Sequence, residues 1–182
     1  MKNTKLLTLI AVMSALAFVL YLVEIPVGFL FPAAPFLKID FSDVPAILLS
    51  ISYGPIVGIV VALFKNILHF IFKSETPLAS GEIANFFAGI AFLLPYSIYL
   101  MKNRVDRLNI KSMVLFYGLG TVLSTLVMIV INYFISLPLY GIPADQRWMY
   151  INAINPFNVF KGVILGLTTI LIYPRLKKFL KA

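Results

Sequence analysis

Long apolar runs separated by short polar segments dominate this chain. Four of these runs, 6–23, 83–101, 112–136 and 156–173, each approach or exceed the ~20 residues that a helix needs to cross a bilayer. Runs of this length are typical of transmembrane helices rather than of buried helices in a soluble domain. The pattern therefore predicts an all-α membrane protein.

A fifth apolar stretch, 43–72, is interrupted by Gly54-Pro55. A glycine followed by a proline commonly ends one helix and starts the next. We therefore expect two helices, 43–53 and 55–72, and a single domain over residues 1–182 built as a six-helix bundle. The helix over 43–53 has a length of only about 15 Å, so neighbouring helices must shield it from lipid.

The distribution of charge supports six helices over five. With six, the N-terminus, the 102–111 loop and the C-terminus share one side of the membrane. That side then carries ten basic residues: Lys2, Lys5, Lys102, Arg104, Arg107, Lys111, Arg175, Lys177, Lys178 and Lys181. Because basic residues concentrate on the cytoplasmic side, we expect a multi-pass protein of the cell membrane with both termini in the cytoplasm. The net charge of +8 is then a topology signal and does not indicate nucleic-acid binding.

The segment between the first two helices, 24–38, is apolar but contains Pro26, Pro32 and Pro35. Three prolines prevent a continuous helix. An apolar, non-helical segment at this depth needs protein around it. We interpret it as a lid folded over the outer mouth of the bundle.

The composition excludes several classes of protein. Hydrophobic residues make up 61% of the chain and charged residues only 12%, against about 25% in a typical soluble domain. The chain has no cysteine and one histidine, His69, so neither thiol catalysis nor a Cys/His metal site is expected. We predict no catalytic residues, no metal and no cofactor, and hence no enzyme.

Polar residues within the apolar helices are the best indicators of function, because burying them is costly without partners. Most of them fall in the outer half of the predicted bundle: Asp40, Glu82, Asn85, Asn132, Asn158 and Lys161. This distribution favours a site that captures a ligand from outside over a continuous pore. Simpler roles stay open for some of them, such as a lysine reaching the lipid headgroups, an acid favouring a helix N-terminus or an asparagine bonding a neighbouring helix.

Two further features have structural interpretations. Lys65, Asn66 and His69 form one stripe of a helix, where an ion pair with an outer acid is the simplest explanation. Ala11 and Ala15 belong to a set of small-residue pairs spaced four apart, which allow helices to approach closely.

Several segments together resemble the substrate-binding S subunits of energy-coupling-factor (ECF) transporters, and most closely the riboflavin-specific ones. The similarity covers nearly the whole chain, and its most specific parts are Leu-Lys-Ile-Asp-Phe-Ser-Asp at 37–43 and Asn-Pro-Phe-Asn-Val-Phe-Lys at 155–161. The resemblance implies capture of riboflavin and docking to a transmembrane coupling protein with two cytoplasmic ABC-type ATPases. It assigns Asn158, Lys161 and Asn132 to the flavin pocket, and Ala11 and Ala15 to the contact with the coupling protein. The full set of predicted substrate-binding residues is Asp40, Phe41, Glu82, Asn85, Asn132, Asn158 and Lys161.

Other functions remain open at this point. An S subunit for a different vitamin, such as thiamin or a precursor, would share most of these features. A structural membrane subunit or a membrane enzyme is the alternative of another class. The chain contains no Walker motif, so any ATP hydrolysis must come from a partner.

The topology can be tested by cysteine labelling, since the native chain has no cysteine. A cysteine introduced at Asn109 should react with a membrane-impermeant maleimide only after the membrane is opened, because its loop is predicted to be cytoplasmic. Labelling of this cysteine in intact cells would rule out the six-helix count.

Overall fold

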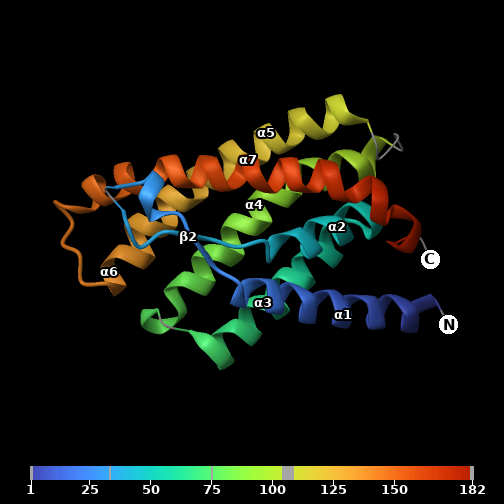
Figure 1. The fold of residues 1–182 in the computed structure, drawn as a ribbon, viewed down its shortest axis with the longest axis horizontal. Helices are drawn as coiled ribbons and strands as arrows, with labels where there is room; N and C mark the ends of the chain where they lie inside the picture. Colours follow the sequence, from blue (N-terminus) through green and yellow to red (C-terminus); the bar gives the residue numbers. More distant parts are fainter. Residues whose placement is uncertain (1, 33, 75, 104–108, 181–182) are drawn as a thin grey trace.

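The structure is a computed structural model that describes residues 2–32, 34–74, 76–103 and 109–180. Within them, six helices make up the bundle and run alongside one another (Figure 1): α1 (Lys2–Leu22), α2 (Asp43–Tyr53), α3 (Pro55–Lys73), α4 (Ser80–Asn103), α5 (Ile110–Ile131) and α7 (Arg147–Leu180). Five are long and apolar enough to cross a membrane, and α2 is the short exception. The predicted six-helix architecture is confirmed.

The break between α2 and α3 lies where the Gly54-Pro55 pair predicts it. Gly54 has a φ of 101°, a region that other residues rarely adopt, and its N–H donates to the carbonyl of Ser50 at 2.9 Å. Pro55 then occupies the first turn of α3, where its missing N–H does not matter. Glycine ends one helix and proline starts the next.

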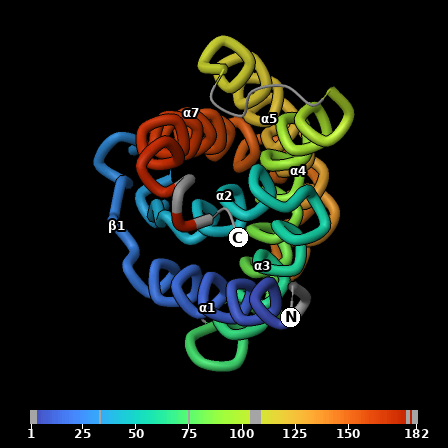
Figure 2. Tube along the Cα trace, turned by 90° about the vertical axis from the view of Figure 1, so that its right-hand side faces the viewer, coloured from blue at the N-terminus to red at the C-terminus, as the bar shows by residue number. Residues whose placement is uncertain are grey.

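Helix α2 occupies the middle of the bundle. All residues from Asp43 to Ser52 are buried, and the helix contacts α1, α3, α4 and α7 (Figure 2). A helix too short to span a bilayer is thus kept away from lipid by four longer ones. Its first turn begins at depth inside the protein, which brings Asp43 into the interior.

The two-residue strands β1 (Ile25–Pro26) and β2 (Lys38–Ile39) pair antiparallel and give the predicted lid segment its shape. A short 3₁₀ turn, η1 (Gly28–Leu30), lies between them. Gly28 approaches the backbone of Pro35 so closely that an added Cβ would lie 2.0 Å from the Pro35 carbonyl oxygen. Only glycine fits there. The segment forms a small core of its own against α7, made by Val27, Ala34, Leu37, Ile39 and Phe157.

Several helix bounds differ from the expected ones. The last helix was expected to start at Pro156, but α7 begins at Arg147 and contains Pro156 in its interior. The proline leaves the Asn152 carbonyl without its usual N–H partner, which a membrane helix tolerates because other groups can satisfy it. The fifth helix continues through a π-helical turn, η3 (Asn132–Ser136), into α6 (Leu137–Leu139), and α4 is preceded by η2 (Pro77–Ala79). The first and fourth helices also start earlier than expected, at Lys2 and Ser80.

The ends of the chain lie together. The N-terminal end of α1, the C-terminal end of α7, the end of α4 and the start of α5 gather at one end of the molecule in Figure 1. This arrangement fits an even number of crossings. Arg104, Arg107 and Lys181, which enter the prediction of cytoplasmic termini, lie outside the described residues, and which end faces the cytoplasm stays a prediction.

The contact between α4 and α5 can be tested with two glycines of the same helix. A Cβ added at Gly120 would lie 2.4 Å from the Phe92 carbonyl oxygen, whereas one added at Gly118 meets no atom within 4 Å. Both substitutions by alanine improve helix propensity by the same amount. We therefore expect Gly120→Ala to be about 1–3 kcal/mol less stable than Gly118→Ala, because only Gly120→Ala forces the helices apart. Thermal unfolding in detergent measures the difference, and equal unfolding temperatures for the two variants would refute the close approach.

Candidate ligand-binding site

A cavity of about 350 Å³ lies beneath the lid, between the 24–42 segment and helices α3, α4, α5 and α7. Its volume falls within the range usual for small-molecule sites, about 300–1,000 Å³. The wall is largely apolar, and its larger apolar side chains are Tyr21, Phe36, Leu37, Phe92, Met128, Tyr140, Phe157 and Leu165. A flat apolar body of one to three rings suits such a wall.

Most of the predicted substrate-binding residues meet at this cavity. Those in its wall are Asp40, Glu82, Asn85, Asn158 and Lys161. Phe41 and Asn132 are not among the lining residues. Phe41 packs against the main apolar core, and Asn132 is buried in the π-helical turn η3, where its Nδ2 has no hydrogen-bond partner among the described residues. A role for these two in binding stays a prediction.

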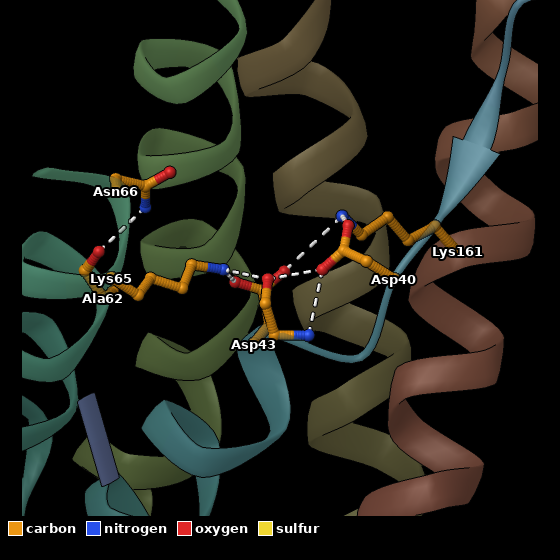
Figure 3. A network of polar contacts seen from close by, with 7 residues as sticks. Asp40, Asp43, Ala62, Lys65, Asn66 and Lys161 are labelled. Atoms are coloured by element: carbon orange, nitrogen blue, oxygen red, sulfur yellow. Dashed lines mark hydrogen bonds and ion pairs between the residues drawn. The ribbon is translucent and has the colours of Figure 1, made fainter. Parts of the chain in front are cut away.

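Lys161 projects from α7 toward two carboxylates near the start of α2. Its Nζ lies 3.1 Å from Asp40 Oδ2 and 3.6 Å from Asp43 Oδ2 (Figure 3). The side chain is only 19% exposed. The ion pairs, rather than lipid headgroups, account for the position of this lysine.

Behind the cavity wall, Lys65 of α3 completes the cluster. It is fully buried, forms an ion pair with Asp43 and donates a hydrogen bond to Ser42 Oγ at 2.6 Å. The expected ion pair of Lys65 is thus present, with Asp43 as the acid. Ser42 stands at the N-cap of α2, but its side chain does not cap the helix. Its backbone N–H donates to Asp40 Oδ1 at 2.9 Å, and its hydroxyl donates to the same oxygen.

Asp40 is ionised at neutral pH. Burial alone would favour the neutral acid, but the positive charges of Lys161 and Lys65 and the hydrogen bonds from Ser42 outweigh it. The pKa of Asp40 is therefore lowered to about 2. The carboxylate accordingly remains a partner for Lys161 throughout the physiological range.

A second polar group lies on the α3 and α4 side of the cavity. His69 Nδ1 is 2.7 Å from Glu82 Oε1, and Thr76 Oγ1 donates to Glu82 Oε2 at 2.9 Å. Tyr21 of α1 stacks on the His69 ring with the ring centroids 3.7 Å apart. The position of Glu82 is thus stabilised by the side chains of His69 and Thr76, and not only by the favourable interaction of an acid with a helix N-terminus. Tyr21 and His69 were not among the predicted site residues, although His69 is the only histidine of the sequence and could have indicated the site.

Three polar atoms of the lining residues are buried without a hydrogen-bond partner among the described residues. They are Asn85 Oδ1, Asn158 Nδ2 and His69 Nε2. Buried polar groups usually find partners, so such atoms in a cavity wall indicate hydrogen-bonding capacity for a ligand. Amide groups can both donate and accept, and they suit a neutral ligand with both functions. Among the described residues, no three His, Asp or Glu side chains gather closely enough to hold a metal ion.

Comparison with known proteins identifies the family. The family model of the ECF transporter substrate-specific component matches residues 5–173. The chain belongs to this family. It is 40% identical to the riboflavin transporter RibU of Staphylococcus aureus (strain TCH60), over 100% of this chain and 95% of that protein. It is 37% identical to the riboflavin transporter FmnP of Bacillus subtilis (strain 168), over 98% of this chain and 95% of that protein.

The fold agrees as well. A solved structure described as "Structure and mechanism of the S component of a bacterial ECF transporter" superposes with a TM-score of 0.82, 38% identity and 99% coverage of both chains. This substrate-specific component is therefore a multi-pass membrane protein that binds and transports a substrate and is not an enzyme. The resemblance noted in the sequence is confirmed.

Proposed function

We propose that this substrate-specific component binds riboflavin and delivers it for uptake into the cell. Relatives covering nearly its whole length are riboflavin transporters at 33–40% identity. The observation that carries the proposal is the composition of the cavity wall. It is largely apolar, and it also contains buried amide atoms of Asn85 and Asn158 that have no hydrogen-bond partner among the described residues.

The chemistry of the cavity fits a flavin. The isoalloxazine ring system is flat and largely apolar, and one edge both donates and accepts hydrogen bonds. Asn158 offers both functions, and Lys161, one helical turn further along α7, offers donors to carbonyl oxygens. Phe36, Phe92 and Phe157 provide the apolar surface for the rings. The carboxylates of Asp40 and Glu82 can accept hydrogen bonds from the ribityl hydroxyls.

Uptake requires a source of energy, and because the chain contains no Walker motif, ATP hydrolysis must come from a partner. We propose that this chain docks to a transmembrane coupling protein with two cytoplasmic ABC-type ATPases, as its family implies. Ala11 and Ala15 are exposed on α1, whereas Met13, Ser14 and Ala17 face the bundle. An exposed small-residue pair leaves room for close approach of another helix. We further propose that both termini face the cytoplasm and that the lid covers the outer mouth.

Riboflavin titration tests the pocket. We expect Asn158→Ala and Lys161→Ala each to weaken binding by ~5- to 150-fold, because unpairing one buried polar group typically costs ~1–3 kcal/mol. The effect of Lys161→Ala should be at least as large as that of Asn158→Ala, because hydrogen bonds from a charged donor are stronger. Quenching of riboflavin fluorescence by the detergent-purified protein gives the dissociation constant.

Exposed residues of the same type provide matched controls. Asn103→Ala and Lys111→Ala remove an amide and an ammonium away from the cavity and should bind like wild type. If wild type binds thiamin and not riboflavin, the ligand assignment is wrong. Wild-type affinity in both pocket variants would place the site elsewhere.

The proposed docking face, formed by Ala11 and Ala15 of α1, can be tested separately from the pocket. Replacing Ala11 or Ala15 by leucine should leave riboflavin affinity unchanged but reduce co-purification with the coupling protein and the rate of uptake, because close helix approach is lost. Val12→Trp, at another exposed position of α1, serves as a control for added bulk. Normal assembly and uptake in both the Ala11→Leu and the Ala15→Leu variant would disprove the assignment of this face.

A further inference from the structure

Lys65 is the least expected charge in the molecule. It lies near the middle of α3, a predicted membrane span, and its side chain is fully buried. It is also absent from the cavity wall, so it cannot contact a ligand there directly. A charge at this depth is costly unless it is paired, and such charges usually mark function.

The contacts of Lys65 lead to the cavity through Asp43, and also through Ser42, whose hydroxyl donates to Asp40. Lys65 pairs with Asp43 Oδ1, and the other oxygen of the same carboxylate, Oδ2, lies 3.6 Å from the Nζ of Lys161 (Figure 3). Asp43 therefore stands between two lysines, one behind the wall and one in it. Gly89 of α4 makes room for this arrangement, since a Cβ there would lie 2.8 Å from Asp43 Oδ1.

The four charges balance. In formal charges, the carboxylates of Asp40 and Asp43 offset the ammonium groups of Lys65 and Lys161. In this balanced state, Lys161 lies closer to Asp40, at 3.1 Å, than to Asp43, at 3.6 Å. Without Lys65, the Asp43 carboxylate would have only the Lys161 ammonium to pair with in this cluster. A second lysine would then no longer offset the attraction between Asp43 and Lys161. The Lys161 ammonium would then shift toward Asp43 and away from Asp40.

We propose that Lys65 is a positioning residue for ligand binding. By neutralising Asp43 from behind the wall, it leaves Lys161 beside Asp40 and available to the ligand. It also leaves the cluster without net charge, which suits a neutral flavin. The inference rests on the proposed function, because the ligand that Lys161 meets is taken to be riboflavin.

The test separates charge balance from a packing role. Lys65→Met keeps most of the side-chain volume and removes the charge. We expect riboflavin affinity to fall by ~10-fold or more, the size of effect known for residues that orient the ligands of a metal ion. Lys65→Met/Asp43→Asn removes one charge of each sign and should recover affinity to within about 3-fold of wild type. Asp40→Asn/Lys161→Met removes the same number of charges but eliminates the ligand contact, so it should stay impaired. Riboflavin titration and thermal unfolding are measured on every variant in detergent.

Each outcome is decisive. Wild-type affinity in a folded Lys65→Met variant overturns the proposal, and so does a double variant, Lys65→Met/Asp43→Asn, that binds no better than Lys65→Met. If Lys65→Met does not fold, the double variant alone decides, because restored charge balance must yield folded protein that binds. Failure of that variant to fold or to bind also overturns the proposal. Lys111→Met, an exposed control, should match wild type. If wild type and Lys111→Met do not bind riboflavin, the proposed function fails instead.

Discussion

Charges buried among apolar helices are the constraint on which this structure depends. Two aspartates and two lysines, from the turn before α2 and from α2, α3 and α7, can lie at this depth only because each has a partner of opposite sign. Removing one member would leave an uncompensated charge in a low-dielectric environment. The cluster thus ties together elements that are far apart in the sequence and fixes the wall of the cavity.

The short helix α2 makes this arrangement possible. Gly54-Pro55 ends it after 11 residues, and its first turn lies inside the bundle. Asp43 and Ser42 therefore reach Lys65, and Asp40, directly after β2, reaches Lys161. The segment between α1 and α2 packs on α7 through its own small core, and its residues Phe36, Leu37 and Lys38 line the same cavity. A helix break, a buried ion network and a covering loop thus contribute to one site.

Much of the fold could be predicted because hydropathy and helix-breaking residues act locally. The runs of apolar residues and Gly54-Pro55 were sufficient for six helices and the short second one. The early start of α7 at Arg147 could not be predicted, because Pro156 is a strong helix-stop signal in water but is tolerated inside a membrane helix. The π-helical turn at Asn132–Ser136 likewise has no local signal in the sequence.

The site was partly predictable for a similar reason. Buried polar residues are rare in membrane helices, so six of them stood out: Asp40, Glu82, Asn85, Asn132, Asn158 and Lys161. All but Asn132 line the cavity. Which of these side chains form ion pairs with one another could not be predicted from the sequence, because the pairing depends on how α2, α3 and α7 pack. The same holds for Tyr21, whose stacking on His69 brings an aromatic residue of α1 into the wall.

The most direct measurement is the absorption spectrum of the protein purified in detergent from cells that contain riboflavin. If the cavity is a flavin site, the purified protein should carry flavin absorption bands, with about one flavin per chain as expected for one small-molecule site. Protein that shows no flavin bands, and that takes up none when riboflavin is added, would contradict the account.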